Sequence, residues 1–304
     1  MRVVTLLPSA TEIVHALGAT DLLVGVSHCC TYPEVVRHLP VMTSTHIPYR
    51  EDSETIDGAV RAHLGGNDAL YDLDLVALAA AKPDVIISQA LCDVCAVSTD
   101  EVAAALCILP GNAQMVDLTP NTLADVFDDI RRVGDALGLA VQSSHLVSDL
   151  ETRLQATTSL SAGIPERERP RVAFLEWLLP PFNGGHWNPE LVTAAGGMDV
   201  LGRAAQPSTT LEWSAVIESE PDVLVIACCG FDVPRALEDV RRASEEPYWQ
   251  QIKAVRDGRV YVIDGNAFFA CPGPRLIDGL EILAHALHPA IHPVAAAGTA
   301  HHFY

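Results

Sequence analysis

The stretch TPNTLADVFDDIRRVGDALGLAVQSSHLVSDLETRLQATTSLS, from Thr119 to Ser161, decides the fold of this chain. Thr119 suits the N-cap of a helix and Pro120 its first turn, and apolar residues then recur at helical spacing until Gly138. A second helix is expected from about Ala140 to Ser161, and at 1.5 Å per residue it would be roughly 33 Å long. The pattern predicts a long, stiff helix between two halves of the chain.

Apolar runs typical of buried strands alternate with helical patterns on both sides of this stretch. They are Val3–Leu7, Leu22–Val26, Val85–Ile87, Met115–Asp117, Arg171–Leu175, Val223–Ala227 and Arg259–Ile263. Such alternation predicts parallel sheets flanked by helices, hence an α/β fold of two lobes. We expect an N-terminal lobe at 1–118, connecting helices at 119–164, a C-terminal lobe at 165–288 and a disordered tail at 289–304. The polar segment 44–66 is expected to be an irregular loop.

The two halves share a sequence pattern. Residues 11–21 align without gaps on residues 189–199 and match at five positions, and Leu-Leu-Pro precedes both copies. Pro-Asp-Val also occurs twice, at 83–85 and at 221–223, each time opening a buried strand. Two matches in the same order favour an internal duplication.

Composition excludes several classes of protein. The formal net charge of −20, with only 19 Lys and Arg in 304 residues, argues against a nucleic-acid or anionic membrane partner. No apolar run approaches the roughly 20 residues of a membrane span. The first residues lack a secretory signal, which predicts a cytoplasmic protein, or a periplasmic or cell-surface one if the chain was trimmed. The eight cysteines are then expected to be mostly reduced thiols.

The segments expected at the carboxyl ends of the strands hold most of the aromatic, His and Cys residues. They are 28–33, 44–66, 88–98, 176–187, 228–232 and 264–273. Ligands of parallel α/β sheets bind beyond the carboxyl ends of the strands. In two lobes that face each other these ends can share a cleft, and we expect the function there.

Several motifs resemble those of a known family, the solute-binding proteins for cobalamin and iron chelates that are related to vitamin B12-binding proteins. The motifs are Leu6–Glu12, Lys82–Ile87, Trp249–Asp264, Cys92–Cys95, Pro181-Phe182 through His186-Trp187, and Pro272–Arg275. The resemblance implies two α/β lobes joined by a single long helix, as in class III periplasmic binding proteins. It also implies that cobalamin, or another corrinoid or metal chelate, is bound as a ligand in the cleft. An ABC permease is then the implied partner, with Glu101, Glu245 or Glu246 as contacts; a solvated acidic surface is the alternative.

Candidate ligand contacts are mostly aromatic, because a flat macrocycle gains from burial against rings. They are Trp187, Trp177, Phe182, His186, Phe231, Phe268, Phe269, Tyr49, Cys92 and Cys95. The competing interpretation is that several of these rings only pack the cores.

Histidine and cysteine supply the candidate metal ligands, because imidazole and thiolate bind transition metals. His28, His46 and His186 are possible axial donors to cobalt or iron. Cys92 and Cys95 form a Cys-x-x-Cys pair, which binds metal, acts as a redox dithiol or is purely structural. A closed zinc site there requires two more ligands, from His28, Cys29, Cys30, Cys228 or Cys229.

Two alternatives to a corrinoid-binding protein remain open. A haem- or ferric-siderophore-binding protein would use Tyr32, Tyr49 and Arg50. A cytosolic metal-thiolate or redox enzyme would use Cys92 and Cys95. The sequence contains no nucleophile elbow, Walker loop or His-Glu-x-x-His, so we expect a protein that is not an enzyme.

Overall fold

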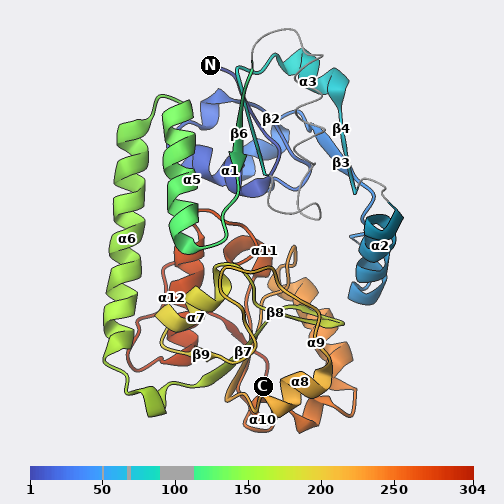
Figure 1. Cartoon of the computed structure of the whole chain (residues 1–304), viewed down its shortest axis with the longest axis vertical. Helices are drawn as coiled ribbons and strands as arrows, with labels where there is room; N and C mark the ends of the chain where they lie inside the picture. The colour runs from blue at the N-terminus through green and yellow to red at the C-terminus, as the bar shows by residue number, and fades with distance from the viewer. Residues whose placement is uncertain (50, 67–69, 90–112) are drawn as a thin grey trace. The chain divides into compact units, whose positions relative to one another are not determined.

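The computed structural model describes residues 1–49, 51–66, 70–89 and 113–304 (Figure 1). The chain divides into two compact units. The first contains Met1–Glu51, Thr55–Pro120 and Ala124–Asp149, and the second contains Asp52–Glu54, Asn121–Leu123 and Leu150–Tyr304. Each unit is an α/β structure with its own sheet and core.

The first unit is built on a parallel sheet in the order β2-β1-β5-β6. Its strands are β1 (Val3–Thr5), β2 (Leu23–Val26), β5 (Val85–Gln89) and β6 (Gln114–Leu118). Its helices include α1 (Pro8–Ala16), α3 (Leu75–Ala81) and α5 (Leu123–Ala136), and a short antiparallel pair is formed by β3 (Thr43–Thr45) and β4 (Tyr71–Leu73). The strands β1 and β5 are buried along their whole length, as expected when helices cover both faces of a sheet.

The second unit has a mixed sheet in the order β12-β11-β10-β7-β8, with β9 beside β7. The strands are β7 (Arg171–Leu178), β8 (Pro181–Asn183), β9 (Met198–Asp199), β10 (Val223–Ile226), β11 (Val260–Val262) and β12 (His301–His302). Its helices are α7 (Asn188–Ala194), α8 (Trp213–Glu218), α9 (Val233–Ser244), α10 (Lys253–Arg256), α11 (Gly265–Phe268) and α12 (Leu276–Leu287). Figure 1 shows α7 and α12 on one side of this sheet and α8 and α9 on the other, which buries β10 completely.

The same topology occurs in both units, as the duplicated sequence pattern predicts. The order β2-β1-β5-β6 of the first sheet corresponds to β9-β7-β10-β11 of the second, and all these strands are parallel. The aligned segments form α1 and α7, and each is followed by a glycine with a positive φ, +74° at Gly18 and +87° at Gly196. Strand β8 is an addition of the second unit.

The long helix predicted after Gly138 is α6 (Ala140–Ala162), 23 residues and therefore about 34 Å long. Its residues up to Asp149 belong to the first unit and those from Leu150 to the second, so the predicted connecting segment 119–164 is divided between the units. No helix among the described residues has the length and apolarity that crossing a membrane requires.

Three local predictions were wrong. Segment 44–66 is not an irregular loop, because it contains the end of β3 and the helix α2 (Ser53–Gly66), in which Ile56 is buried. Helix α5 begins at Leu123 rather than at Thr119, and the amide of this first residue donates to the Glu190 carboxylate at 3.3 Å. The tail is not disordered: His301–His302 pair with β11, and the Tyr304 hydroxyl accepts from the Trp249 indole at 2.8 Å. The first residue of α5 and the tail both have partners far away in the sequence.

Candidate functional site

Three neighbouring strands of the second unit each have an aromatic residue at or a few residues beyond their carboxyl end. Trp177 lies near the carboxyl end of β7, Phe231 follows β10, and Phe268 ends α11, which follows β11. Because these strands are parallel neighbours, the three residues share one edge of the sheet. The Trp177 and Phe231 rings lie 4.8 Å apart between centroids, tilted by 41°. We call Trp177, Phe231 and Phe268 the aromatic edge.

A glycine and a cap fix the position of Phe268. Asp264 caps α11 by accepting from the Ala267 amide at 2.7 Å. A Cβ on Gly265 would lie 2.2 Å from the Cys228 carbonyl oxygen, so only glycine permits this close approach to the backbone after β10. The Asn266 amide donates to the Phe231 carbonyl at 3.2 Å. Helix α11 is therefore held directly against Phe231.

Two arginines accompany the aromatic edge. The Arg235 guanidinium lies 4.2 Å from the centroid of the Phe231 ring, and the Arg275 guanidinium lies 5.8 Å from that of Phe268. Both contacts are within the range of cation–π attraction. Phe182 is paired directly opposite Trp177 in the β7–β8 register and is half-buried, so it extends the apolar surface next to Trp177.

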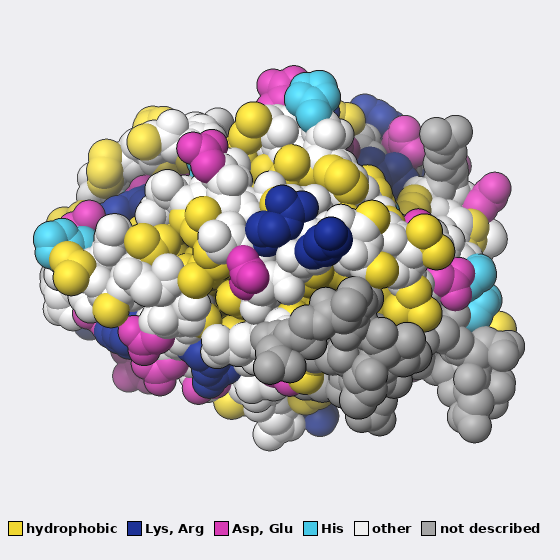
Figure 2. Space-filling view, turned by 90° about the horizontal axis from the view of Figure 1, so that it is seen from above, with side chains coloured by type: hydrophobic (Ala, Val, Ile, Leu, Met, Phe, Trp, Pro, Cys, Tyr) yellow, Lys and Arg dark blue, Asp and Glu magenta, His cyan; other side chains and the backbone are white. Residues whose placement is uncertain are grey.

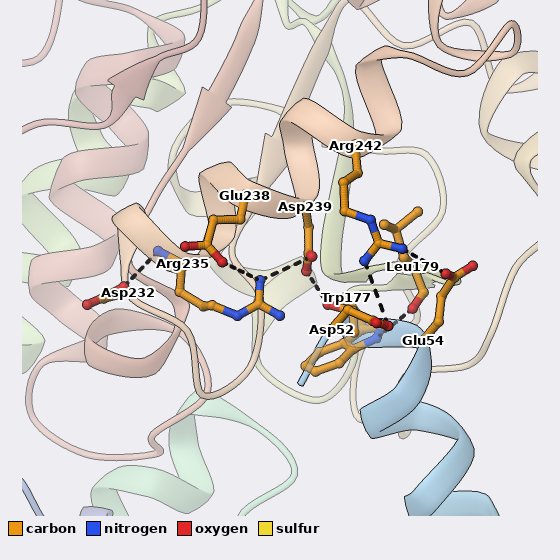
Figure 3. Close-up of polar contacts among 10 residues, drawn as sticks. Asp52, Glu54, Trp177, Leu179, Asp232, Arg235, Glu238, Asp239 and Arg242 are labelled. Carbon is orange, nitrogen blue, oxygen red and sulfur yellow. Dashed lines mark hydrogen bonds and ion pairs between the residues drawn. The ribbon is translucent and has the colours of Figure 1, made fainter. Parts of the chain in front are cut away.

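Arg235 is held by a buried ionic network, shown in Figure 3. Its guanidinium contacts the Asp239 carboxylate at 3.1 Å, and Asp239 is only 1% exposed. The Ser53 hydroxyl donates to the other oxygen of Asp239. Asp232 caps α9 by accepting from the Arg235 amide at 2.9 Å. The guanidinium next to the Phe231 ring is thus held by Asp239, which in turn is held by Ser53.

A second cation of α9 anchors the start of α2. The Arg242 guanidinium lies 2.9 Å from the Glu54 carboxylate and 3.7 Å from that of Asp52 (Figure 3). Both carboxylates belong to the short segment Asp52–Glu54 of the second unit. These pairs are largely exposed, so we assign them a positioning role and little stability.

Trp187 and Phe269 are core residues in this structure. Trp187 is 5% exposed and its indole N–H donates to the Phe269 carbonyl at 2.8 Å. Phe269 is fully buried against Phe174, with ring centroids 5.1 Å apart. The His186 ring stacks on Trp187 at 5.4 Å, and burial lowers the pKa of His186. The predicted contact set therefore contains both edge residues and packing residues.

Two carboxylates lie under this face of the second unit. Burial raises the pKa of Glu176, although its carboxylate accepts from the Gly185 amide at 2.7 Å and the Asn188 amide group at 2.6 Å. Burial likewise raises the pKa of Asp199 to about 6. The hydrogen bonds of Glu176 hold the loop after β8, which carries His186, whereas Asp199 accepts from the Leu201 and Gly202 amides.

In the first unit, three donor atoms converge after β2. The His28 Nε2 atom lies 2.6 Å from the Tyr49 hydroxyl and 3.1 Å from the Cys29 Sγ, and Sγ lies 3.5 Å from that hydroxyl. The His28 Nδ1 atom is 2.7 Å from the Thr43 hydroxyl. Burial lowers the pKa of His28 and raises those of Cys29 and Tyr49, so all three are neutral near pH 7.

The other predicted metal ligands do not join this group. The His46 Nε2 atom lies 2.9 Å from the Asp72 carboxylate, and the His46 ring stacks on His63. Cys30 is buried beside the Thr11 hydroxyl at 3.0 Å, and burial raises its pKa to about 12. Cys92, Cys95, Arg50 and Glu101 lie outside the described residues. Across the described ranges, no three His, Cys, Asp or Glu side chains are gathered for a metal, and no disulfide joins the described cysteines.

Sequence reasoning missed Thr43, Arg235 and the pairing of Tyr49 with His28. Arg235 had a usable signal, because it follows Phe231 by four residues at the start of a helix. Thr43 and the pairing of Tyr49 with His28 had none, since only the β3–β4 pair and the chain that follows β3 bring these residues to His28.

The second unit also contains a cavity of about 370 Å³. It is lined by Leu179–Pro181, Thr210–Trp213, Glu54, Arg242, Glu246 and Tyr248. This volume is at the lower end of the range for drug-sized ligands, so the cavity is too small for a whole tetrapyrrole.

The repeated parallel sheets flanked by helices are the α/β fold of class III periplasmic binding proteins. The chain belongs to the periplasmic binding protein family, whose profile matches residues 3–267. Among curated proteins, an uncharacterized ABC transporter substrate-binding lipoprotein of Bacillus subtilis, YvrC, is 23% identical over 302 residues. That alignment covers 95% of this chain and 80% of the relative.

Solved structures share the fold over nearly the whole chain. The apo haem-binding protein RhuT of Roseiflexus sp. RS-1 has a TM-score of 0.70 and 23% identity, covering 96% of this chain and 99% of its own. A periplasmic haem-binding protein of Pseudomonas aeruginosa has a TM-score of 0.73 and 20% identity, and the match covers 98% of this chain and 97% of that protein. The vitamin B12-binding protein BtuF of Vibrio cholerae has a TM-score of 0.68 and 20% identity, and the match covers 95% of this chain and 97% of BtuF.

These comparisons bear on two of the predictions. By its name the curated relative is a substrate-binding lipoprotein of an ABC transporter, and the solved structures are named as haem- and vitamin B12-binding proteins, so these names describe binding proteins and not enzymes. Their names describe periplasmic proteins or a lipoprotein, so the predicted cytoplasmic location has no support from them.

Proposed function

We propose that this protein binds a flat metal chelate, in the first place a corrinoid such as cobalamin, and that it does so without catalysis. The observation that supports the proposal is the aromatic edge of the second unit. Three adjacent parallel strands place Trp177, Phe231 and Phe268 at one edge of the sheet. The Phe231 and Phe268 rings each have an arginine guanidinium next to them.

The chemistry of this edge matches the chemistry of a corrinoid. Burying apolar macrocycle surface against rings contributes about 25 cal/mol per Å². The amide groups around a corrin accept hydrogen bonds, and the guanidinium of Arg275 is a suitable donor because Arg carries several N–H groups. A ring surface next to fixed cations therefore favours a flat ligand with polar substituents.

We further propose delivery of the ligand to an ABC permease, the role that the names of the relatives imply for those proteins. This role requires a location outside the cytoplasm. Glu245 and Glu246, which follow α9, are exposed and carry the acidic charge that would meet a basic permease surface.

A titration with cyanocobalamin tests the proposal. Both axial positions of this probe are occupied, so binding depends on ring and edge contacts alone. We expect saturable binding by calorimetry and a rise in Tm. Trp177→Ala should weaken the affinity about 10- to 100-fold, because an aromatic anchor contributes on the order of 1–3 kcal/mol. Trp213→Ala, which removes a tryptophan outside the edge, is the matched control.

Absence of binding, or equal losses in both variants, would overturn the proposal. Haem is the second candidate, favoured by the Tyr49 hydroxyl beside His28 Nε2, a pair that suits a ferric axial position. A parallel titration with haemin decides between them. Haemin binding that is lost in Tyr49→Phe, without cyanocobalamin binding, would select haem.

A further inference from the structure

We propose that His28, Cys29 and Tyr49 of the first unit form a binding site for a single divalent metal ion of the Zn²⁺ or Co²⁺ type. This site is separate from the aromatic edge and does not depend on a chelate ligand. It combines one nitrogen, one sulfur and one oxygen donor, and it leaves a fourth position open.

The spacing of the donor atoms carries the proposal. The N–S and S–O separations are 3.1 and 3.5 Å, and the N–O separation is 2.6 Å. In a tetrahedral site with bonds of about 2.0–2.3 Å, donors lie roughly 3.3–3.7 Å apart. Two separations are close to these values, and a swing of the half-exposed Tyr49 ring opens the third.

The tautomer of His28 is already the one a metal needs. The Thr43 hydroxyl has one hydrogen, which it donates to the Ser27 hydroxyl at 3.0 Å. The 2.7 Å contact between Thr43 Oγ1 and His28 Nδ1 must then use the Nδ1 hydrogen. The lone pair is left on Nε2, the atom that faces Tyr49 and Cys29. Such an outer hydrogen bond is a regular feature of metal-binding histidines.

Neighbouring groups hold both donors from more than one side. The His28 amide donates to Thr43 at 3.1 Å, and the Cys29 amide donates to Ser27 at 3.4 Å. The buried Tyr71 ring lies 5.5 Å from the His28 ring. The donor pair is therefore fixed by β3, β4 and the end of β2.

Binding exchanges protons for the metal. The Cys29 thiol loses its proton to solvent as the sulfur–metal bond forms, and neutral His28 donates its lone pair without releasing one. Tyr49 binds either as a hydroxyl or, with release of a second proton, as a phenolate. Affinity should therefore increase with pH.

The experiment is a titration with Co²⁺ alone, in a Cys92→Ser/Cys95→Ser background that removes the thiol pair outside the described residues. We expect one Co²⁺ per chain, a near-ultraviolet sulfur-to-cobalt charge-transfer band, and displacement of Co²⁺ by Zn²⁺. Cys29→Ser should abolish the band. It should also weaken binding at least tenfold, as should His28→Gln. Tyr49→Phe should retain the band with a smaller loss.

Cys229→Ser, which removes an exposed thiol of the second unit, is the control and should bind like the background protein. Far-ultraviolet circular dichroism verifies that each variant is folded. A band that persists in Cys29→Ser, or no Co²⁺ binding by the folded background protein, would overturn the site. Neither result depends on cyanocobalamin binding, so this proposal and the corrinoid proposal fail separately.

Discussion

The Asp222 carboxylate accepts a hydrogen bond from the backbone amide of Arg171 at 2.8 Å, and the first unit repeats this contact between Asp84 and Arg2 at 2.7 Å. Each arginine also donates from its side chain to the carbonyl two residues before the Pro-Asp pair, Ser219 in one unit and Ala81 in the other. The repeated Pro-Asp therefore has a common structural role. In each unit the Asp carboxylate, just before one strand, accepts from a backbone amide at or just before the start of the neighbouring parallel strand: β10 and β7 in the second unit, β5 and β1 in the first.

Asp222→Asn should lower the free energy of unfolding by about 0.5–1.5 kcal/mol, because it also breaks the ion pair of Asp222 with Lys253 at 3.0 Å. Asp84→Asn, at the more exposed copy, should cost less. Burial alone would raise the pKa of Asp222, but the Arg171 amide and Lys253 outweigh it and lower the pKa. This stabilisation is then complete above the ordinary value of 3.8 and is lost as the pH falls further. Urea unfolding of both variants at several pH values checks these points. A loss for Asp222→Asn that is as large in acid as at neutral pH, or no larger than the loss for Asp84→Asn, would contradict them.

Asp129→Asn should stabilise the protein at alkaline pH. Asp129 is 2% exposed, and burial raises its pKa to about 7 despite Arg132 at 2.8 Å. A raised carboxyl pKa stabilises the fold below the ordinary value, and that contribution is lost as the pH rises through the folded value. We expect a gain of about 1 kcal/mol near pH 8 and none near pH 4. Asp128→Asn, on the exposed side of α5, is the control. Chemical unfolding of the variants at pH 4 and pH 8 measures this difference in the free energy of unfolding.

Arg153→Lys should destabilise the second unit although it keeps the charge. The Arg153 guanidinium contacts both oxygens of Glu281 at 2.8 Å and Asp278 at 2.6 Å, which fastens α6 to α12. A lysine cannot reproduce this fork, and we expect a loss of about 1–2 kcal/mol. Thermal unfolding measures it, with Arg131→Lys, in an exposed pair on α5, as the control. A Tm equal to that of the unmodified protein would show that the fork is dispensable.

Arg235→Met should cost about 2–4 kcal/mol, because it leaves the Asp239 carboxylate buried without its cation. The double variant Arg235→Met/Asp239→Asn should recover part of this loss, since no buried charge remains. Chemical unfolding of the two variants is the measurement. A double variant less stable than the single one would contradict this explanation of the network.

The sequence predicted the elements that depend on local pattern. The break at Gly138 and the extent of α6 follow from helical spacing and from a residue that takes a positive φ, +72° here. The fully buried runs at Val85 and Val223 mark central parallel strands, because such strands are apolar on both faces. These signals are contained in a few neighbouring residues, so one chain suffices to read them.

The sequence did not predict what depends on partners far along the chain. Phe231 and Trp187 look alike as aromatic residues in loops, yet one contacts a cation and the other donates to a core carbonyl. The tail strand His301–His302 exists because β11 offers an unpaired edge. Burial and pairing are set by the whole fold and not by residue type.

By itself, then, the sequence determined the α/β class and the strand–helix pattern that occurs in both units, since hydrophobic periodicity and turn residues act over short distances. Only the tertiary structure decided which side chains of those loops meet. His28, Cys29 and Tyr49 converge because strand pairing joins β3 to β4 and the chain turns back after β3, and the distances between their donor atoms are fixed by that packing.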